Sequence, residues 1–298
     1  MRKLFLVLPL MLPVAATAQA VMTWLMPDLP PASIRLDGQP STGIVDMEIA
    51  YVAAHWPEVE HRYIYANLKR SWTMLDAGEP ACYSFTLINA ERLKRAYIVE
   101  TIALPPLQLF VRAEAAAMLP FNADHQVDLA QLLAMRTLRG LLSEKRSYGV
   151  QLDAILRKRP PDASLKLTTI GSYGENIFSK MRLSRADYTI DYDFVYAYYQ
   201  SRNPKLSGLQ SVPIAGSGEL LKSGFACPKT PWGKATAQRI DAILGTREGA
   251  QAMRRSLDNW LSPNTRQLYA NQFAAFYRQR ERPMRRFDDQ QQARESKP

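Results

Sequence analysis

The loop of Ser147, Tyr148 and Gly149 has residue types and a position suited to binding an anion in this 298-residue chain. These residues precede a predicted helix, where free backbone N–H groups meet the positive end of the helix dipole. The same three residues would also serve as a plain helix cap. The loop is therefore a candidate anion site with a structural alternative.

A row of tyrosines lies on one predicted helix. Tyr192, Tyr196 and Tyr199 are spaced i, i+4 and i+7, so they share a helical face. This spacing suits core packing, or an aromatic surface whose first member, Tyr192, reaches a binding site. Asp191 and Asp193 flank Tyr192 and point to different faces, so they do not form a catalytic pair.

The chain lacks the common signatures of a hydrolase. There is no G-x-S-x-G elbow, H-E-x-x-H helix or S-x-x-K run in a suitable place. The nearest resemblance is the loop of residues 216–218, whose glycines lack the spacing of a phosphate cradle and are typical of a surface turn. Nothing in these residues therefore requires catalysis, and a hydrolase would need an unrecognised dyad.

The cysteines and histidines exclude a metal centre and pose one structural question. Cys82 and Cys227 either pair with each other or both remain free thiols. His55, His61 and His125 are too few and too scattered for a zinc site. We expect neither a metal nor another cofactor.

The ends of the chain have their own composition. Met1–Ala20 combines a basic start, a short apolar run and an A-x-A site, as a secretory signal peptide does. Export would place the cysteines where disulfides persist. Residues 281–298 form a polar tail.

The formal net charge of +10 suits solubility, an anionic ligand or an acidic envelope surface, but no basic face interleaved with aromatics predicts nucleic-acid binding.

Alternating strand and helix patterns run through the rest of the chain and predict parallel sheets covered by helices. The apolar periodicity predicts strands over 21–26, 61–66, 81–87, 96–99, 165–170, 186–190, 209–214 and 224–227, with an extended connector over 107–111. It predicts helices over 44–53, 68–75, 128–138, 151–156, 177–183, 235–244, 250–261 and 265–277, besides the tyrosine-rich helix.

Seven short motifs, in this order and spacing, resemble the periplasmic solute-binding proteins of family 3, the amino-acid-binding type. The resemblance covers roughly residues 21–261 and is nearest to an uncharacterised branch with two cysteines. The segments that carry it are Trp24–Pro31, Gly43–Asp46, Ala77–Cys82, Asn89–Arg92, Ser147–Val150, Ser184–Asp187 and Ala226–Lys229.

The resemblance implies a two-lobe type II periplasmic binding protein fold of the α/β class, with two crossover strands. Residues 21–108 and 222–280 would form lobe 1, including the C-terminal helices, and residues 109–221 would form lobe 2. The returning strand would enter the first sheet between its third and fourth strands. Gly224–Cys227 would then lie beside Ala81–Thr86, and because paired strands are about 4.8 Å apart, Cys82 could form a disulfide with Cys227. Buried free thiols are the alternative.

The resemblance also implies where the ligand binds. Arg92 matches the family arginine that grips a ligand carboxylate, a role that suits the planar fork of a guanidinium. An ion pair with Glu91 or Glu100 is the alternative. Asp28, in the first loop, is expected at the ligand. Arg70 could point into the same cleft or remain at a solvated helix start.

Departures from the family pattern argue against a free amino acid as the ligand. Leu87 replaces a hydroxyl residue, which leaves Ser84 and Thr86 as substitutes. The acidic residue that takes the ligand's amino group in the family falls near Tyr192. We therefore expect a small polar or anionic solute, which also involves the loop of residues 147–149.

The expected function is that of a non-enzymatic, monomeric periplasmic protein that captures this solute for an inner-membrane transporter or sensor. The alternative is an exported protein with the same fold whose cleft has lost ligand binding and which acts through protein contacts in the envelope. Neither alternative involves nucleic acid.

Overall fold

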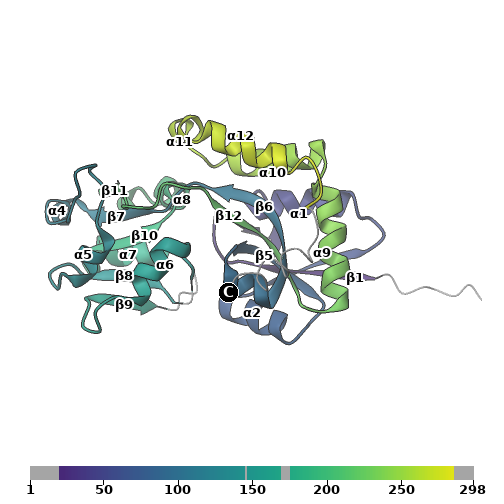
Figure 1. Cartoon of the computed structure of the whole chain (residues 1–298), viewed down its shortest axis with the longest axis horizontal. Coiled ribbons are helices and arrows are strands. Elements are labelled where there is room, and N and C mark those ends of the chain that lie inside the picture. Colours follow the sequence, from purple (N-terminus) through teal and green to yellow (C-terminus); the bar gives the residue numbers. More distant parts are fainter. Residues whose placement is uncertain (1–19, 145, 169–174, 285–298) are drawn as a thin grey trace, which may run out of the picture.

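The computed structural model describes residues 20–144, 146–168 and 175–284, which form two α/β lobes side by side (Figure 1). Each lobe is built on one five-stranded sheet, and the chain crosses between the lobes twice. The predicted two-lobe fold is confirmed. Residues 1–19 of the predicted signal peptide and residues 285–298 of the predicted tail lie outside the described residues.

The sheet of the first lobe has the strand order β4-β1-β5-β12-β6. β4, β1 and β5 are parallel, whereas β12 runs antiparallel to both of its neighbours. The prediction that the returning strand enters between the third and fourth strands is confirmed. The elements of this lobe are β1 (Val21–Met26), α1 (Ile44–Ala54), β4 (Glu60–Tyr65), α2 (Leu68–Asp76), β5 (Ala81–Leu87), α3 (Ala90–Arg95), β6 (Ala96–Leu104), β12 (Leu221–Pro228) and α9 (Pro231–Leu244), with the small pair β2 (Arg35–Leu36) and β3 (Gln39–Pro40).

The sheet of the second lobe has the order β11-β7-β10-β8-β9. β8 is parallel to β9 and β10, and β7 is antiparallel to β10 and β11. The elements of this lobe are β7 (Gln108–Arg112), α4 (Ala113–Ala116), α5 (Leu129–Ala134), β8 (Gly140–Ser143), α6 (Val150–Arg157), β9 (Leu165–Thr168), α7 (Glu175–Arg182), β10 (Tyr188–Asp191), α8 (Asp193–Arg202), the 3-10 helix η1 (Pro204–Leu206) and β11 (Leu209–Pro213).

Three C-terminal helices lie along the side where the chain crosses between the lobes: α10 (Arg247–Asp258), α11 (Pro263–Leu268) and α12 (Ala270–Gln279) (Figure 1). A buried ion pair of 2.6 Å between Arg280 and Asp241 of α9 ties their end to the first lobe. Thr265 of α11 donates a 2.8 Å hydrogen bond to Asp193 of the second lobe. The C-terminal helices therefore contact both lobes.

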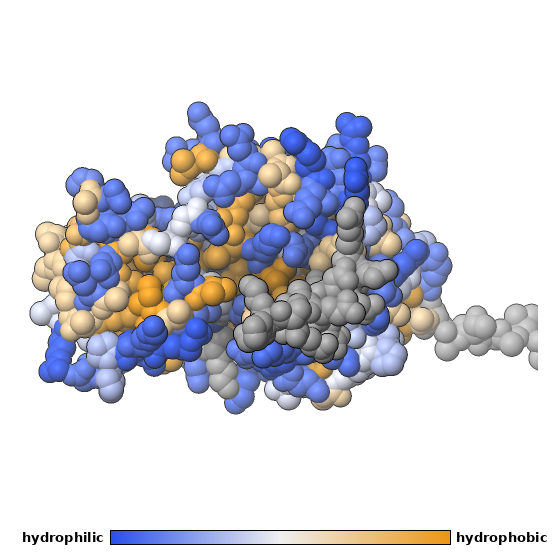
Figure 2. Space-filling view, in the orientation of Figure 1, coloured by the Kyte–Doolittle hydropathy of each residue, from blue (hydrophilic) through white to orange (hydrophobic). Residues whose placement is uncertain are grey.

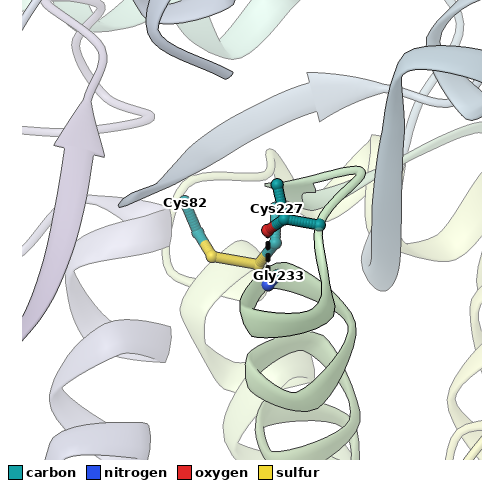
Figure 3. Close-up of a disulfide and its surroundings, with 4 residues drawn as sticks. Cys82, Cys227 and Gly233 are labelled. Atoms are coloured by element: carbon teal, nitrogen blue, oxygen red, sulfur yellow. Dashed lines mark hydrogen bonds between the residues drawn. A yellow bond between two sulfur atoms is a disulfide. The ribbon is translucent and has the colours of Figure 1, made fainter. Parts of the chain in front are cut away.

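A disulfide joins Cys82 of β5 to Cys227 of β12, as the resemblance implied (Figure 3). The two Cα atoms are 4.3 Å apart, and both side chains are fully buried. The first turn of α9 approaches this point closely: a Cβ on Gly233 would lie 2.0 Å from the carbonyl oxygen of Pro228. Only glycine therefore permits this approach between α9 and the end of β12.

Several predicted elements need correction. The helix α3, which was not predicted, follows β5, and the extended connector is β7, a strand inside the second sheet. The helix predicted over 128–138 ends at Ala134, and β8, which was not predicted, follows it. The helix predicted over 265–277 is two helices, which meet at Tyr269. Within the described ranges, no helix is long and apolar enough to cross a membrane.

Candidate functional site

Three cavities are lined by residues of both lobes, and two of these three share part of their lining. The larger of these two has a volume of about 510 Å³ and the smaller about 140 Å³. Across the middle of the molecule, apolar surface gathers between hydrophilic borders (Figure 2). Six residues line both cavities, three from each lobe: Leu68, Lys69, Arg92, Ser143, Arg146 and Ser147.

Arg92 is the buried charged residue of the first lobe at this junction, whereas Lys69, which also lines both cavities, is exposed. It lies in α3, whose first turn is capped by the Asn89 side chain, which accepts a 2.9 Å hydrogen bond from the Arg92 amide. The side chain points inward and leaves the residue only 8% exposed. Its guanidinium donates to the Leu87 carbonyl at 3.1 Å and lies 5.6 Å from the ring centroid of Trp72.

The alternative role for Arg92, an ion pair with a neighbouring glutamate, is wrong. Glu91 pairs with Arg95, and Glu100 pairs with Lys222. None of the described carboxylates lies within ion-pair distance of Arg92. Burial lowers the pKa of Arg92, although the tyrosine and carboxylates nearby oppose this. A guanidinium remains charged in proteins, so Arg92 is a buried cation with only neutral hydrogen-bond partners in this part of the chain.

The loop of residues 147–149 does not offer the free N–H groups that the sequence predicted. Asp153, in the first turns of α6, accepts a 2.7 Å bond from the Tyr148 amide and a 2.5 Å bond from the Ser147 hydroxyl. The Gly149 amide donates to the Ser147 hydroxyl oxygen at 3.3 Å. The carboxylate of Asp153 therefore occupies the position where an anion was expected.

The residues of this loop line two different cavities between the lobes. Ser147 and Tyr148 line the larger cavity, whereas Gly149, again with Tyr148, lines a third cavity between the start of α6 and β12. Gly149 caps α6 with a φ of +90°, a conformation that favours glycine. The Tyr148 hydroxyl accepts a 2.9 Å bond from the Ser143 amide. Gly149 thus has a structural role as the cap of α6, and its contact with the ligand stays a prediction.

Arg146 is the charged residue of the second lobe at the junction. It forms a 3.0 Å ion pair with Asp191 at the end of β10, and both side chains are largely buried. Its guanidinium lies 5.0 Å and 5.5 Å from the ring centroids of Tyr148 and Tyr192. Because Asp191 offsets the charge of Arg146, Arg92 is the buried cation in this shared lining that no described carboxylate offsets.

Aromatic side chains from both lobes form the wall of the smaller cavity. Tyr83 and Phe85 come from β5, and Tyr192 comes from the start of α8. The ring of Tyr192 stacks on that of Phe194, with 5.0 Å between the ring centroids. Burial raises the pKa of Tyr83 to about 12, while the charges of Arg92 and Arg146 oppose the rise. Tyr192 was therefore placed correctly at the cleft.

The period-two geometry of β5 corrects two predicted site residues. Tyr83, Phe85 and Leu87 face the smaller cavity, so Ser84 and Thr86 point to the opposite face of the sheet. Both are buried there, and the Ser84 hydroxyl donates to the Leu25 carbonyl at 3.1 Å. Neither lines a cavity between the lobes, so neither is placed to bind the ligand.

Arg70 and Asp28 have different outcomes. Arg70 is exposed in the first turn of α2, where its amide donates to the Asn67 cap, and it lines neither cavity. The prediction that it enters the cleft is not supported. Asp28 is exposed at the lining of the smaller cavity, as expected. Partial burial raises the pKa of the Asp28 carboxyl, and Arg35 opposes the rise.

Two further motif residues are structural. Asp46 accepts hydrogen bonds from the Ser33 hydroxyl and from three backbone amides, and so fixes the loop between β1 and α1. Asp187 pairs with Arg139 and Arg112, which joins the strands of the second sheet. Hydrogen bonds from Arg139 lower the pKa of Asp187. These motifs therefore reflect the fold and not the ligand.

Sequence reasoning missed most of the cavity lining. Tyr83 and Phe85 could have been found from the alternation along β5, by choosing the face opposite to Ser84. Asp153 follows Ser147 within reach of a helix start, which is a recognisable capping arrangement. Nothing in the sequence singled out Arg146. Among the residues that the structure describes, no group of three or more His, Cys, Asp or Glu could hold a metal ion.

Comparisons with known proteins identify the fold. No protein-family model matches the chain, and no curated protein does. A histidine kinase sensor domain with similarity to periplasmic binding proteins is 15% identical, with a TM-score of 0.63, over 82% of this chain and 96% of that one. The substrate-binding protein of an amino acid ABC transporter is 14% identical, with a TM-score of 0.60, over 81% and 99%.

A third similar structure is an ancestral amino-acid-binding protein, a precursor of cyclohexadienyl dehydratase, at 16% identity and a TM-score of 0.60, over 82% of this chain and 96% of that one. Identities this low establish a shared fold and no more. The chain therefore has the two-lobe fold of the type II periplasmic binding proteins, with cavities where its lobes meet.

Proposed function

We propose that this protein is an exported, periplasmic solute-binding protein of the family 3 type that captures a small polar or anionic solute between its lobes. The observation that carries the proposal is Arg92, a buried cation with only neutral partners among the described residues, which opens onto both cavities. A buried charge is stable only when it is paired or well hydrogen-bonded. An anionic group of a solute would supply the missing partner.

The two crossings between the lobes support a closing motion. Leu107 lies between β6 and β7, and residues 214–220 connect β11 to β12. We place the hinges there, with lobe 1 formed by residues 21–108 and 222–280 and lobe 2 by residues 109–221. A solute that contacts both lobes favours the closed state only by its differential affinity for that state. The monomer would then deliver its solute to an inner-membrane transporter or report it to a sensor.

One observation favours the rival proposal, that the cleft binds no solute and the protein acts through contacts in the envelope. Asp153 already occupies the donors of the loop at residues 147–149. In this second proposal Asp153 replaces the ligand carboxylate permanently.

A thermal-shift screen distinguishes the two. The mature protein is tested against carboxylates, dicarboxylates, amino acids and phosphate, with Arg92→Ala as the test variant. Arg255→Ala is the control, because it removes the same charge from an exposed face of α10. At a hundredfold excess over the dissociation constant, binding adds about 2.7 kcal/mol, which is a rise of roughly 5 to 10 °C for a chain of this size.

The proposal predicts that at least one anion raises the melting temperature of wild type and Arg255→Ala. Losing a charge-assisted contact costs about 1.5 to 3 kcal/mol, so Arg92→Ala should bind that anion at least tenfold more weakly. If no compound shifts wild type, the proposal is wrong and the protein-contact alternative gains support. Mass spectrometry of whatever co-purifies with the natively expressed protein would identify the solute independently.

A further inference from the structure

Arg92 stands between two cavities of different size and chemistry. It lines both, together with Ser147 of the second lobe. A solute whose anionic group binds Arg92 can therefore extend in two directions from that point. The linings of the two cavities indicate which chemical group each direction accepts.

The smaller cavity accepts an apolar group. Besides the basic residues Lys69, Arg92 and Arg146, its lining includes aliphatic and aromatic side chains from both lobes: Leu29, Leu87, Tyr83, Phe85 and Tyr192. Its acidic residues, Asp28 and Glu144, are both exposed. The volume of about 140 Å³ is close to that of an apolar protein cavity of about 150 Å³ that holds one benzene molecule. This space fits one six-membered ring.

The larger cavity is predominantly basic. Its lining includes six basic side chains, Lys69, Arg92, Arg95, Arg146, Arg157 and Arg159, but only three acidic ones, Asp76, Glu91 and Asp153. Arg95 engages Asp76 and Glu91, and Asp153 is held by the loop at residues 147–149. The polar, charged end of a solute therefore belongs on this side of Arg92.

We propose that the solute is an amphipathic organic anion with one ring-sized apolar group. Its carboxylate binds Arg92, and its ring enters the smaller cavity against Tyr83, Phe85 and Tyr192. This assignment rests on the proposed function and narrows its substrate class. It places the discrimination between solutes in the smaller cavity and the attraction for anions at Arg92.

NMR titrations with three probes test the assignment: phenylacetate, acetate and phenylethanol. Acetate carries the anionic group alone, and phenylethanol carries the ring without the charge. Fully burying an aromatic side chain stabilises by about 1.5 to 3 kcal/mol, so we expect phenylacetate to bind roughly 10- to 100-fold tighter than acetate. Arg92→Ala should weaken phenylacetate at least tenfold and leave phenylethanol unchanged.

A variant that fills the smaller cavity separates the ring from the charge. Leu29→Trp should remove the advantage of phenylacetate over acetate without weakening acetate. Leu268→Trp is the matched control, because Leu268 is 68% exposed on α11 and lines none of the cavities described above. It should retain the full difference between the two acids.

The outcomes also separate this inference from the proposed function. If both acids bind wild type equally and Leu29→Trp changes neither, the ring assignment is wrong and the anion site at Arg92 stands. If neither acid binds wild type, the anion site fails and the ring assignment fails with it.

Discussion

Removing the disulfide between Cys82 and Cys227 should cost the protein a large part of its stability. The bridge closes a loop with a sequence separation of 145, which includes the whole of the second sheet. In the chain-entropy account, such a loop gives about 5 kcal/mol, whereas measured values are commonly about 2 to 4 kcal/mol. A globular domain is stable by only about 5 to 15 kcal/mol in total.

The perturbation is the double variant Cys82→Ala/Cys227→Ala, which avoids placing serine hydroxyls at fully buried positions. A loss of about 3 kcal/mol should lower the melting temperature by roughly 6 to 12 °C for a chain of this size. Urea unfolding of wild type with and without reductant should show the same difference. Because the sulfurs are buried, the reductant needs to act on unfolded protein.

Alkylation of the unfolded protein gives the decisive count. Without reductant no thiol should react, and with reductant two should react. Two reactive thiols in the unreduced protein, or a double variant as stable as wild type, would refute the reasoning. Either result would mean that no disulfide between the adjacent strands β5 and β12 stabilises the fold.

Three further predictions concern the carboxyl groups of Glu48, Asp241 and Asp153. Burial raises the pKa of Glu48 to about 8, so the native state keeps a proton that the unfolded state loses near its ordinary value of 4.5. The free energy of unfolding should therefore fall as the pH rises between these values, by up to about 1.4 kcal/mol per pH unit. Urea midpoints measured across this range should lose the slope in Glu48→Gln and keep it in the exposed control Glu58→Gln. Arg280→Met leaves Asp241 buried and uncompensated and should cost about 3 to 5 kcal/mol in urea unfolding, most of which Arg280→Met/Asp241→Leu should restore; equal stability of both variants would contradict this. Asp153→Ala frees the donors of the loop at residues 147–149 and removes a negative charge near Arg92. Acetate should therefore bind this variant about fivefold tighter than wild type, roughly 1 kcal/mol, as measured by NMR titration. Weaker binding would contradict the role given to Asp153.

The sequence predicted the arrangement of strands better than the direction of side chains. Apolar periodicity located β1, β4, β5 and α9, and the resemblance located the insertion of β12 beside β5. The disulfide followed from that adjacency. These features depend on the order of elements along the chain, which a pattern of apolar residues records.

The site depended on details that the pattern does not record. Ser84 and Thr86 were placed at the ligand, but the pleat of β5 turns them to the opposite face from Tyr83. A one-residue change of register exchanges the two faces of a strand, so a motif alone does not decide which face is exposed. The loop at residues 147–149 was predicted to have free N–H groups. Its acceptor, Asp153, lies further along the chain in α6, so the loop residues alone do not reveal it.

Long-range contacts were also beyond the sequence. The hydrogen bond from Thr265 to Asp193, and the edge-to-face contact of Trp260 with Tyr198 at 5.8 Å, connect the C-terminal helices to the second lobe. No local pattern indicates which lobe a C-terminal helix packs against. In the proposed closure, these contacts need to persist or slide.

The central claim is that an anion held at Arg92 draws the two lobes together. Small-angle scattering of wild type and Arg92→Ala, each with and without saturating phenylacetate, tests it most directly. We predict that phenylacetate reduces the radius of gyration of wild type and leaves that of Arg92→Ala unchanged at the same concentration. An unchanged wild-type profile, with binding confirmed by NMR in the same sample, would contradict the claim.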